Sequence, residues 1–268
     1  MASRSALGPA AVPIYLAATL VAAFLLAPLV VPILISFSDT PFVTWPPQGF
    51  TLRWYVKILG EQEFVDSFRF SLMLGVIATL GALVLGTPAA MGLVRYRFPG
   101  RGIIQGLLLS PLIFPMLVTG IALLRAATAT GAQNSLVNLG LGHVLVTVPY
   151  VVRTVSASLL LVDPSIEEAS RTLGANRLRS FWWVTRPQIM PGIVAGAIFA
   201  FVTSFDNYPV SMWLADAVNI PLPLMIFTLT SRFFDPGIAA IASLMILLSV
   251  VLILVMERVT GLKRAMSM

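Results

Sequence analysis

The sequence contains no cysteine and only one histidine among its 268 residues. The absence of cysteine excludes disulfides, thiol nucleophiles and cysteine-ligated metal sites. The single histidine, His143, has no acidic residue near it in the sequence, so we interpret it as a polar contact rather than a metal ligand. The phosphate-binding patterns GxGxxG and GxxxxGK[ST] are absent as well. We therefore expect no cofactor in this chain, and any ATP and Mg²⁺ to be bound by another subunit.

Charged residues are also scarce. They make up 10% of the chain, whereas hydrophobic residues make up 58%, and soluble domains carry about 25% charged residues. The composition therefore predicts a protein whose solvent is mostly lipid. The net charge of +6 does not indicate nucleic acid, because the basic residues form no patch interleaved with aromatic residues. They fall in short clusters between apolar runs, as in membrane proteins.

A helix needs about 20 apolar residues to cross a bilayer. Six apolar runs reach that length, at about 13–35, 69–94, 103–125, 141–161, 190–214 and 236–257. They predict an all-α membrane protein with six transmembrane helices in a single domain over residues 1–268. Pro111 and Pro115 lie inside the third run and should kink or unwind it, because proline removes a helical hydrogen bond. The connection 36–68 should hold an irregular segment and a short amphipathic helix.

The basic residues orient these helices. Eleven of the seventeen Lys and Arg residues lie on the same side if the connections alternate: Arg4, Arg95, Arg97, Arg101, Arg171, Arg177, Arg179, Arg186, Arg258, Lys263 and Arg264. Basic connections face the cytoplasm. The pattern predicts that both termini and the connection at 163–186 are cytoplasmic.

A polar segment at residues 163–191 interrupts the apolar runs. Pro164 should end the preceding helix, and Asp163 or Ser165 should cap a new one, with Ser165 and Glu168 spaced as a capping box. Glu167 and Arg171 are spaced as an i,i+4 ion pair, and Gly174 should stop the helix. A second short helix should run from residue 176 to about 184. The segment is thus predicted to be a helix–turn–helix that docks onto a soluble partner.

The same segment resembles a known motif. The residues Glu168-Ala169-Ser170, Gly174-Ala175, Phe181, Val184, Pro187 and Pro191 are similar to the EAA loop of binding-protein-dependent ABC importer permeases. Arg186 departs from the pattern, since that family has an apolar residue there. Further stretches, among them LGTPAAMGLVRYRFPGR and SFDNYPVSMWL, resemble the second permease subunit of spermidine/putrescine importers.

The resemblance implies the type I permease fold, a location in the bacterial inner membrane and a role as the pore-forming subunit rather than an enzyme. It also implies a coupling surface for the ATPase subunit, formed by Glu167, Glu168, Ala169, Ser170, Leu173, Gly174 and Ala175. The implied partners are a second permease subunit in a heterodimer, two ATP-binding subunits, a periplasmic or extracellular substrate-binding protein and the lipid bilayer. The substrate would be a polyamine, or another amine, an opine, a phosphonate or ferric ion. A secondary transporter is the rival, but the inverted repeats expected of one are not evident.

Asp206 is the most informative residue of the fifth apolar run. An unpaired carboxylate inside a membrane costs roughly 2.5–3.5 kcal/mol on insertion scales, so it should face a partner or a watery cavity. Phe199, Val202, Thr203 and Asp206 recur on one helical face, with Tyr208 a step further. Carboxylates beside aromatic rings suit a cationic amine, which predicts a substrate pathway. The alternatives are an ion pair with Arg125, Arg153 or Arg232, or a cap on a helix broken near Pro209.

Overall fold

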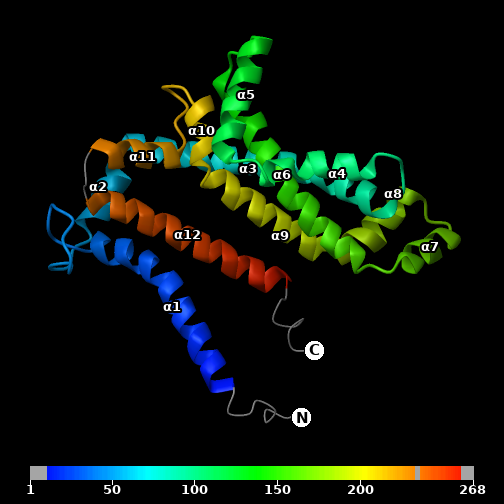
Figure 1. The fold of residues 1–268 in the computed structure, drawn as a ribbon, viewed down its shortest axis with the longest axis horizontal. Coiled ribbons are helices and arrows are strands. Elements are labelled where there is room, and N and C mark those ends of the chain that lie inside the picture. The colour runs from blue at the N-terminus through cyan, green and yellow to red at the C-terminus, as the bar shows by residue number, and fades with distance from the viewer. Residues whose placement is uncertain (1–10, 233–235, 261–268) are drawn as a thin grey trace. The chain divides into compact units, whose positions relative to one another are not determined.

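A computed structural model describes residues 11–232 and 236–260. All regular elements within these residues are helices, which confirms the predicted all-α class (Figure 1). The chain divides into two compact units. Unit 1 comprises residues 1–61 and 229–248, and unit 2 comprises residues 62–228 and 249–268.

Unit 1 begins with α1 (Ala11–Ser36), which corresponds to the first predicted span. Its large apolar side chains are exposed along most of its length, including Phe24 at 78%. A helix that is apolar all round and yet uncovered requires lipid or another protein around it. Its last turns line an apolar cavity of about 210 Å³ together with Ile238, Ala239 and Ala242, from the first turns of α12 (Pro236–Thr260).

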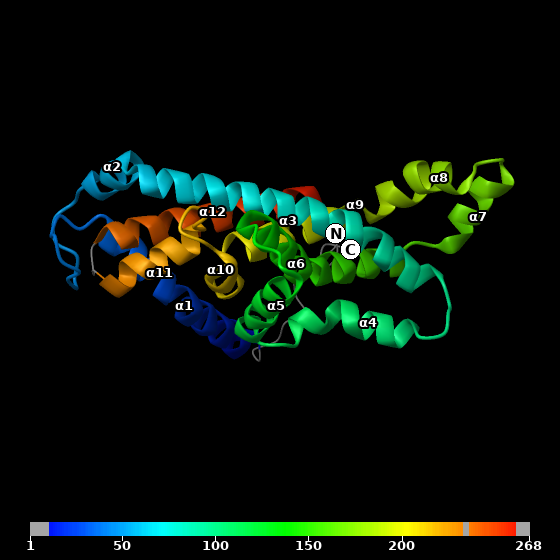
Figure 2. The ribbon, with the colours of Figure 1, turned by 90° about the horizontal axis from the view of Figure 1, so that it is seen from above.

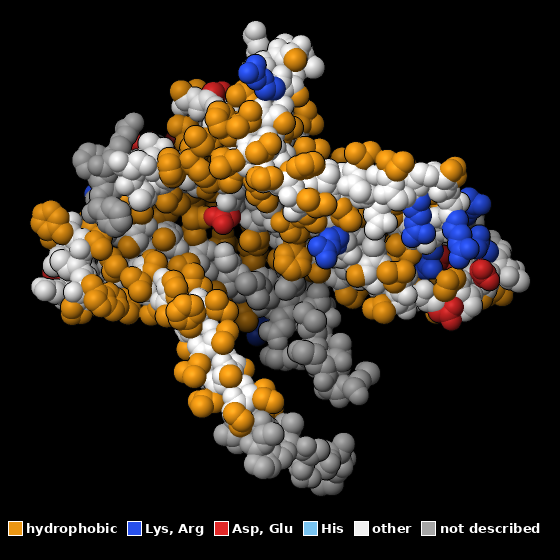
Figure 3. Space-filling model, in the orientation of Figure 1, with side chains coloured by type: hydrophobic (Ala, Val, Ile, Leu, Met, Phe, Trp, Pro, Cys, Tyr) orange, Lys and Arg blue, Asp and Glu red, His pale blue; other side chains and the backbone are white. Residues whose placement is uncertain are grey.

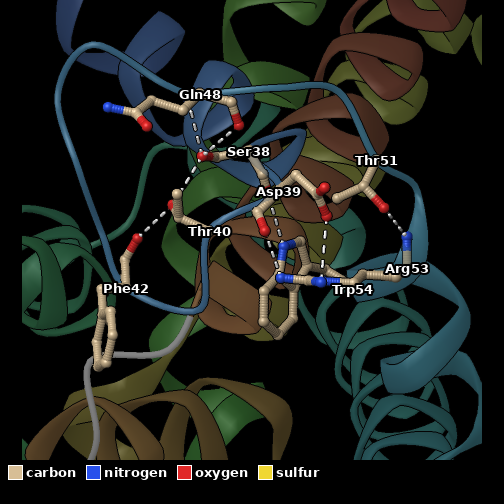
Figure 4. Close-up of polar contacts among 8 residues, drawn as sticks. All are labelled: Ser38, Asp39, Thr40, Phe42, Gln48, Thr51, Arg53 and Trp54. Carbon is tan, nitrogen blue, oxygen red and sulfur yellow. Dashed lines mark hydrogen bonds and ion pairs between the residues drawn. The ribbon is translucent and has the colours of Figure 1, made fainter.

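The connection after α1 is irregular and is held together by polar contacts (Figure 4). The Ser38 hydroxyl lies 3.0 Å from the Thr40 hydroxyl, and the Trp54 indole N–H donates to the Ser38 carbonyl at 2.7 Å. Arg53 pairs with Asp39 at 3.1 Å. The predicted short amphipathic helix follows as α2 (Arg53–Gly60), so both local predictions for this segment are confirmed.

Unit 2 is built on three long helices, α3 (Gln62–Arg95), α6 (Ser135–Leu160) and α9 (Arg186–Phe205), which pack side by side (Figure 2). Small residues let the helices approach closely. A Cβ placed at Gly192 of α9 would lie 2.6 Å from the Thr154 carbonyl oxygen of α6. Close approach at glycine is the usual way to pack helices in a bilayer, where dispersion rather than the hydrophobic effect joins them.

The third predicted span is broken, as its prolines predict. It consists of α4 (Arg101–Leu109), a 3₁₀ turn at Ser110–Leu112, and α5 (Met116–Thr130). The two parts meet at 106°. Pro111 stands in the 3₁₀ turn and Pro115 caps α5, so each proline occupies a place where a missing backbone N–H leaves no helical hydrogen bond unmade.

The fifth predicted span, 190–214, needs two corrections. The helix before it does not stop at Pro187: α8 (Arg177–Ser180) runs through a π-helical turn at Phe181–Thr185 into α9, giving one helix over Arg177–Phe205. The wider π turn removes the clash that a proline ring makes with the carbonyl of residue i−4. The span then ends early, because Asn207 starts a separate helix, α10 (Tyr208–Leu214), which carries Pro209 in its first turn.

The remaining helices are α7 (Pro164–Thr172), between α6 and α8, and α11 (Leu222–Arg232), before α12. Among the described residues, four helices are long and apolar enough to cross a membrane, and a fifth is gained if the bent α4–α5 pair is one span. The sixth predicted span, 236–257, lies within α12, a helix of 25 residues whose apolar part with described side chains covers Pro236–Leu252.

Candidate functional site

Helix α7 projects at one end of the α3–α6–α9 bundle, and α10 lies at the other (Figure 1). The N-cap of α7 is Asp163, whose carboxylate accepts a hydrogen bond from the Ser165 backbone N–H at 2.9 Å. Ser165 therefore lies inside the helix, and the predicted capping box with Glu168 does not form. The hydrogen bond from the Ser165 backbone holds the pKa of Asp163 below its ordinary value. The stabilisation it gives is present above the ordinary aspartate pKa and is lost as pH falls through the lowered one.

Gly174 ends α7, as predicted. Its φ is +91°, in the left-handed region that favours glycine. The Gly174 N–H donates to the Arg171 carbonyl at 3.0 Å and the Ala175 N–H to the Ser170 carbonyl at 3.1 Å. This pair of hydrogen bonds is the Schellman motif, which closes a helix C-terminus. The turn is therefore tightly defined by its backbone.

The outer surface of α7 is open. Glu168, Ala169 and Gly174 are exposed, as is Leu173, whose exposed fraction reaches 89%. Ser170 and Ala175 are half-buried, and the Ser170 hydroxyl lies 2.8 Å from that of Ser180 in α8. This hydroxyl contact joins α7 to α8, and the two helices together form the projecting tip of the unit. Six of the seven residues predicted to form the coupling surface are thus gathered on or just beneath one small projecting tip.

Glu167 is the exception, because its side chain turns inward. Its Oε1 accepts hydrogen bonds from Arg95 at 2.8 Å and from Thr185 at 2.9 Å. The predicted i,i+4 pair with Arg171 is therefore wrong: Arg95, at the end of α3, is the partner. Both side chains are largely buried, 16% and 20% exposed, and less solvent makes an ion pair stronger. Glu167 thus ties α7 to α3 and to the start of α9.

A polar cavity of about 280 Å³ lies behind this ion pair, lined among others by Arg95, Glu168, Arg171 and Arg177. Figure 3 shows that Lys and Arg side chains gather over the end of the unit that carries α7 and α8. The Arg95 Nε is buried and has no hydrogen-bond partner among the described residues. The tip is therefore electropositive around a compact, well-defined turn.

The predicted pathway residues lie on both sides of the end of α9. Phe199, Val202 and Thr203 lie in α9 and are exposed or half-buried, and the Phe199 ring stacks on Tyr150 of α6 at 6.3 Å. Tyr208 lies beyond the break, in α10, with its ring 4.6 Å from that of Phe227. The break thus separates Tyr208 from the other three.

Asp206 is exposed and lies at this break, as the C-cap of α9. Within the described side chains, its carboxylate has no ion pair, so pairs with Arg125 and Arg153 do not form. The side chain of Arg232 lies outside the described residues. The capping alternative holds only for the position: Asp206 ends α9, but its carboxylate does not cap α10, because Asn207 accepts the Val210 N–H there at 3.0 Å. The geometry leaves Asp206 as an accessible carboxylate at the end of a broken helix.

His143 holds the two sides of the break together. Fully buried in α6, it lies with Nδ1 2.8 Å from the Ser204 hydroxyl of α9 and Nε2 3.1 Å from the Ser211 hydroxyl of α10. Both ring nitrogens are therefore hydrogen-bonded, in agreement with the predicted polar contact. The sequence gives no signal for this bridge, because the three residues are spread over α6, α9 and α10.

Comparison with known proteins finds relatives that match most of the chain. A family model described as binding-protein-dependent transport system inner membrane component matches residues 82–262. The putrescine transport system permease protein PotI of Escherichia coli strain K12 is 33% identical over 83% of this chain and 82% of its own length. The spermidine/putrescine transport system permease protein PotC of the same strain is 30% identical over 88% of this chain and 89% of its own.

The fold is also similar to that of solved structures whose sequence identity to this chain is low. A chain in the crystal structure of a bacterial ABC transporter involved in the import of the acidic polysaccharide alginate superimposes with a TM-score of 0.68. It covers 97% of this chain and 98% of its own length at 18% identity. At that identity the comparison concerns the fold.

Proposed function

The chain belongs to the family of binding-protein-dependent transport system inner membrane components, and from this premise we propose that it imports a polyamine such as putrescine or spermidine. It is a multi-pass permease subunit of an ABC importer and has the type I permease fold. ATPase activity in this family lies in a partner subunit, and the family implies ATP-binding subunits and a substrate-binding protein as partners. We propose that residues 1–268 form a single permease domain.

The observation that supports coupling to ATP is the α7 tip. It is exposed and sharply turned at Gly174, and the Glu167–Arg95 ion pair fastens it to the bundle. We propose that ATP-driven closure of the partner subunits moves this tip, and that the movement passes to α3 and α9. The helices then open the pathway alternately to each side of the membrane. The companion in the dimer is proposed to be a second, related permease.

Asp206 supports the choice of a cationic substrate. Its carboxylate is accessible at the break, and the stacked rings of Phe199 and Tyr150 provide aromatic surface on the neighbouring turns of α9 and on α6. Such an arrangement attracts an amine both by charge and by cation–π interaction. The relatives named for putrescine and spermidine point to the same chemical class.

The substrate is tested with the complete transporter, reconstituted with its binding protein. We expect putrescine or spermidine to stimulate ATP hydrolysis. An opine, a phosphonate and ferric ion should leave the basal rate unchanged. If one of these three stimulates hydrolysis and a polyamine does not, the role as an importer subunit stands but the proposed substrate is wrong.

The orientation is tested by labelling. The chain has no cysteine of its own, so single cysteines give no background. Arg177→Cys at the tip and Glu63→Cys at the start of α3 are both exposed positions. If both termini and residues 163–186 are cytoplasmic, an impermeant maleimide added outside should label position 63 and spare position 177. Labelling of both from one side would refute the proposed topology.

A further inference from the structure

A shallow hollow of about 360 Å³ lies on the helix that begins at Arg177. It is lined by Leu178, Arg179, Trp182, Trp183 and Arg186. Its apolar members are unusually open, with Trp183 82% exposed and Leu178 66% exposed. Neither the coupling surface nor the substrate pathway uses these residues. Two exposed indoles between two arginines need an explanation, because large aromatic side chains are costly to leave in water.

The arginines of the hollow carry uncompensated charge. None of the ion pairs between described side chains involves Arg179 or Arg186. The Arg186 guanidinium lies 4.9 Å from the Trp182 ring centroid, a cation–π distance that orients the cation while leaving its N–H groups available. The hollow therefore offers fixed hydrogen-bond donors for an anion beside an apolar floor. Guanidinium groups match phosphate geometry especially well.

The position of the hollow identifies the source of that anion. It lies on the first turns of the continuous helix Arg177–Phe205, which is apolar enough to cross a membrane. At about 1.5 Å per residue, positions 178 to 186 occupy roughly the first 14 Å of that helix, where a span meets the headgroup layer. Tryptophan is enriched at that depth, and arginine there contacts lipid headgroups.

We propose that this hollow binds the headgroup of an anionic phospholipid. The guanidinium groups of Arg179 and Arg186 hold the phosphate oxygens, and Trp182 and Trp183 pack against the glycerol and the first methylenes of the acyl chains. The bound lipid covers the exposed indoles next to the coupling tip. The site needs neither transport nor a particular substrate, so it stands or falls separately from the proposed function.

The test uses the full chain in its assembled transporter, in bilayers of phosphatidylcholine with a minor fraction of phosphatidylglycerol. The quenching of tryptophan fluorescence is measured in two kinds of bilayer. In one the phosphatidylglycerol is brominated, and in the other the phosphatidylcholine is brominated. The signal of the hollow is the quenching lost in a Trp182→Phe, Trp183→Phe variant. We expect phosphatidylglycerol to be preferred, and Arg179→Gln and Arg186→Gln to lower that preference about fivefold each, from the roughly 1 kcal/mol that one arginine contributes near an anionic surface. The control, Arg97→Gln, removes an exposed arginine outside the hollow and should leave it unchanged.

Three outcomes would overturn the proposal. The first is equal quenching by both lipids, or a preference that the two arginine variants do not alter. The second is a change in the tryptophan fluorescence of the hollow when inorganic phosphate is added in purely neutral bilayers, which would make the ligand a soluble anion. The third is a preference seen only without the ATPase subunits, together with loss of those subunits in Arg186→Gln, which would make the hollow a protein contact.

Discussion

Gly174→Trp is expected to abolish transport while the chain still inserts in the membrane and assembles with its companion permease. A Cβ placed on Gly174 meets no atom within 4 Å, so the new side chain starts from open space. It projects from the tip of α7 into the space that the ATPase subunit is proposed to fill. The measurement is uptake and ATPase association on the same membranes. Normal values of both would refute the docking role of the tip.

Backbone strain is the competing cause, since φ at Gly174 is +91°. A residue with a side chain pays about 1–2 kcal/mol in a left-handed conformation. Asparagine tolerates that conformation better than alanine but is larger. If strain dominates, Gly174→Asn transports better than Gly174→Ala, whereas if close docking dominates the order is reversed. We expect the reversed order.

Gly131 provides the matched control. It is also a helix-ending glycine, at the C-terminus of α5, with φ +71° and no atom within 4 Å of a Cβ placed on it. Gly131→Trp therefore introduces similar strain and a similar exposed ring away from α7. It should retain most of its transport. A loss equal to that of Gly174→Trp would assign the effect to the backbone.

Features that depend on neighbouring residues were predictable from the sequence. The end of α7 at Gly174 and the break at Pro111 and Pro115 both follow from the backbone limits of single residues. The early end of the fifth span had a local signal too, because asparagine two residues before a proline is a typical helix start. Hydropathy hides that signal, since residues 208–214 are nearly as apolar as the helix before them.

Features that join distant segments were not predictable. Arg95 and Glu167 are 72 positions apart, and only the packing of α3 against α6 brings them together. The local alternative, Arg171, has the right spacing and charge, so the sequence favours the wrong partner. In the sequence His143 is likewise an isolated polar residue. Its two partners come from α9 and α10, which only the fold brings next to it.

Asp206→Asn is expected to depress polyamine uptake roughly 30-fold while leaving the assembled complex intact. Loss of a charge contact on binding costs about 2–5 kcal/mol, and the lower end applies because the carboxylate is exposed in the single chain. The change keeps the size and hydrogen-bonding capacity of the side chain. Assembly should survive, because Asp206 has no ion pair with a described side chain and Asn207, not Asp206, caps α10.

Two further variants separate charge from structure. Asp206→Glu keeps the charge and should recover part of the uptake, while Asp66→Asn removes another exposed carboxylate, at the start of α3, and should have little effect. Uptake and assembled complex are measured on one preparation. Loss of assembly in Asp206→Asn would mean that the carboxylate has a structural partner, such as an arginine of the companion subunit. Unchanged uptake with intact assembly would remove Asp206 from the pathway, since an accessible carboxylate that bound a cationic substrate could not lose its charge without a cost.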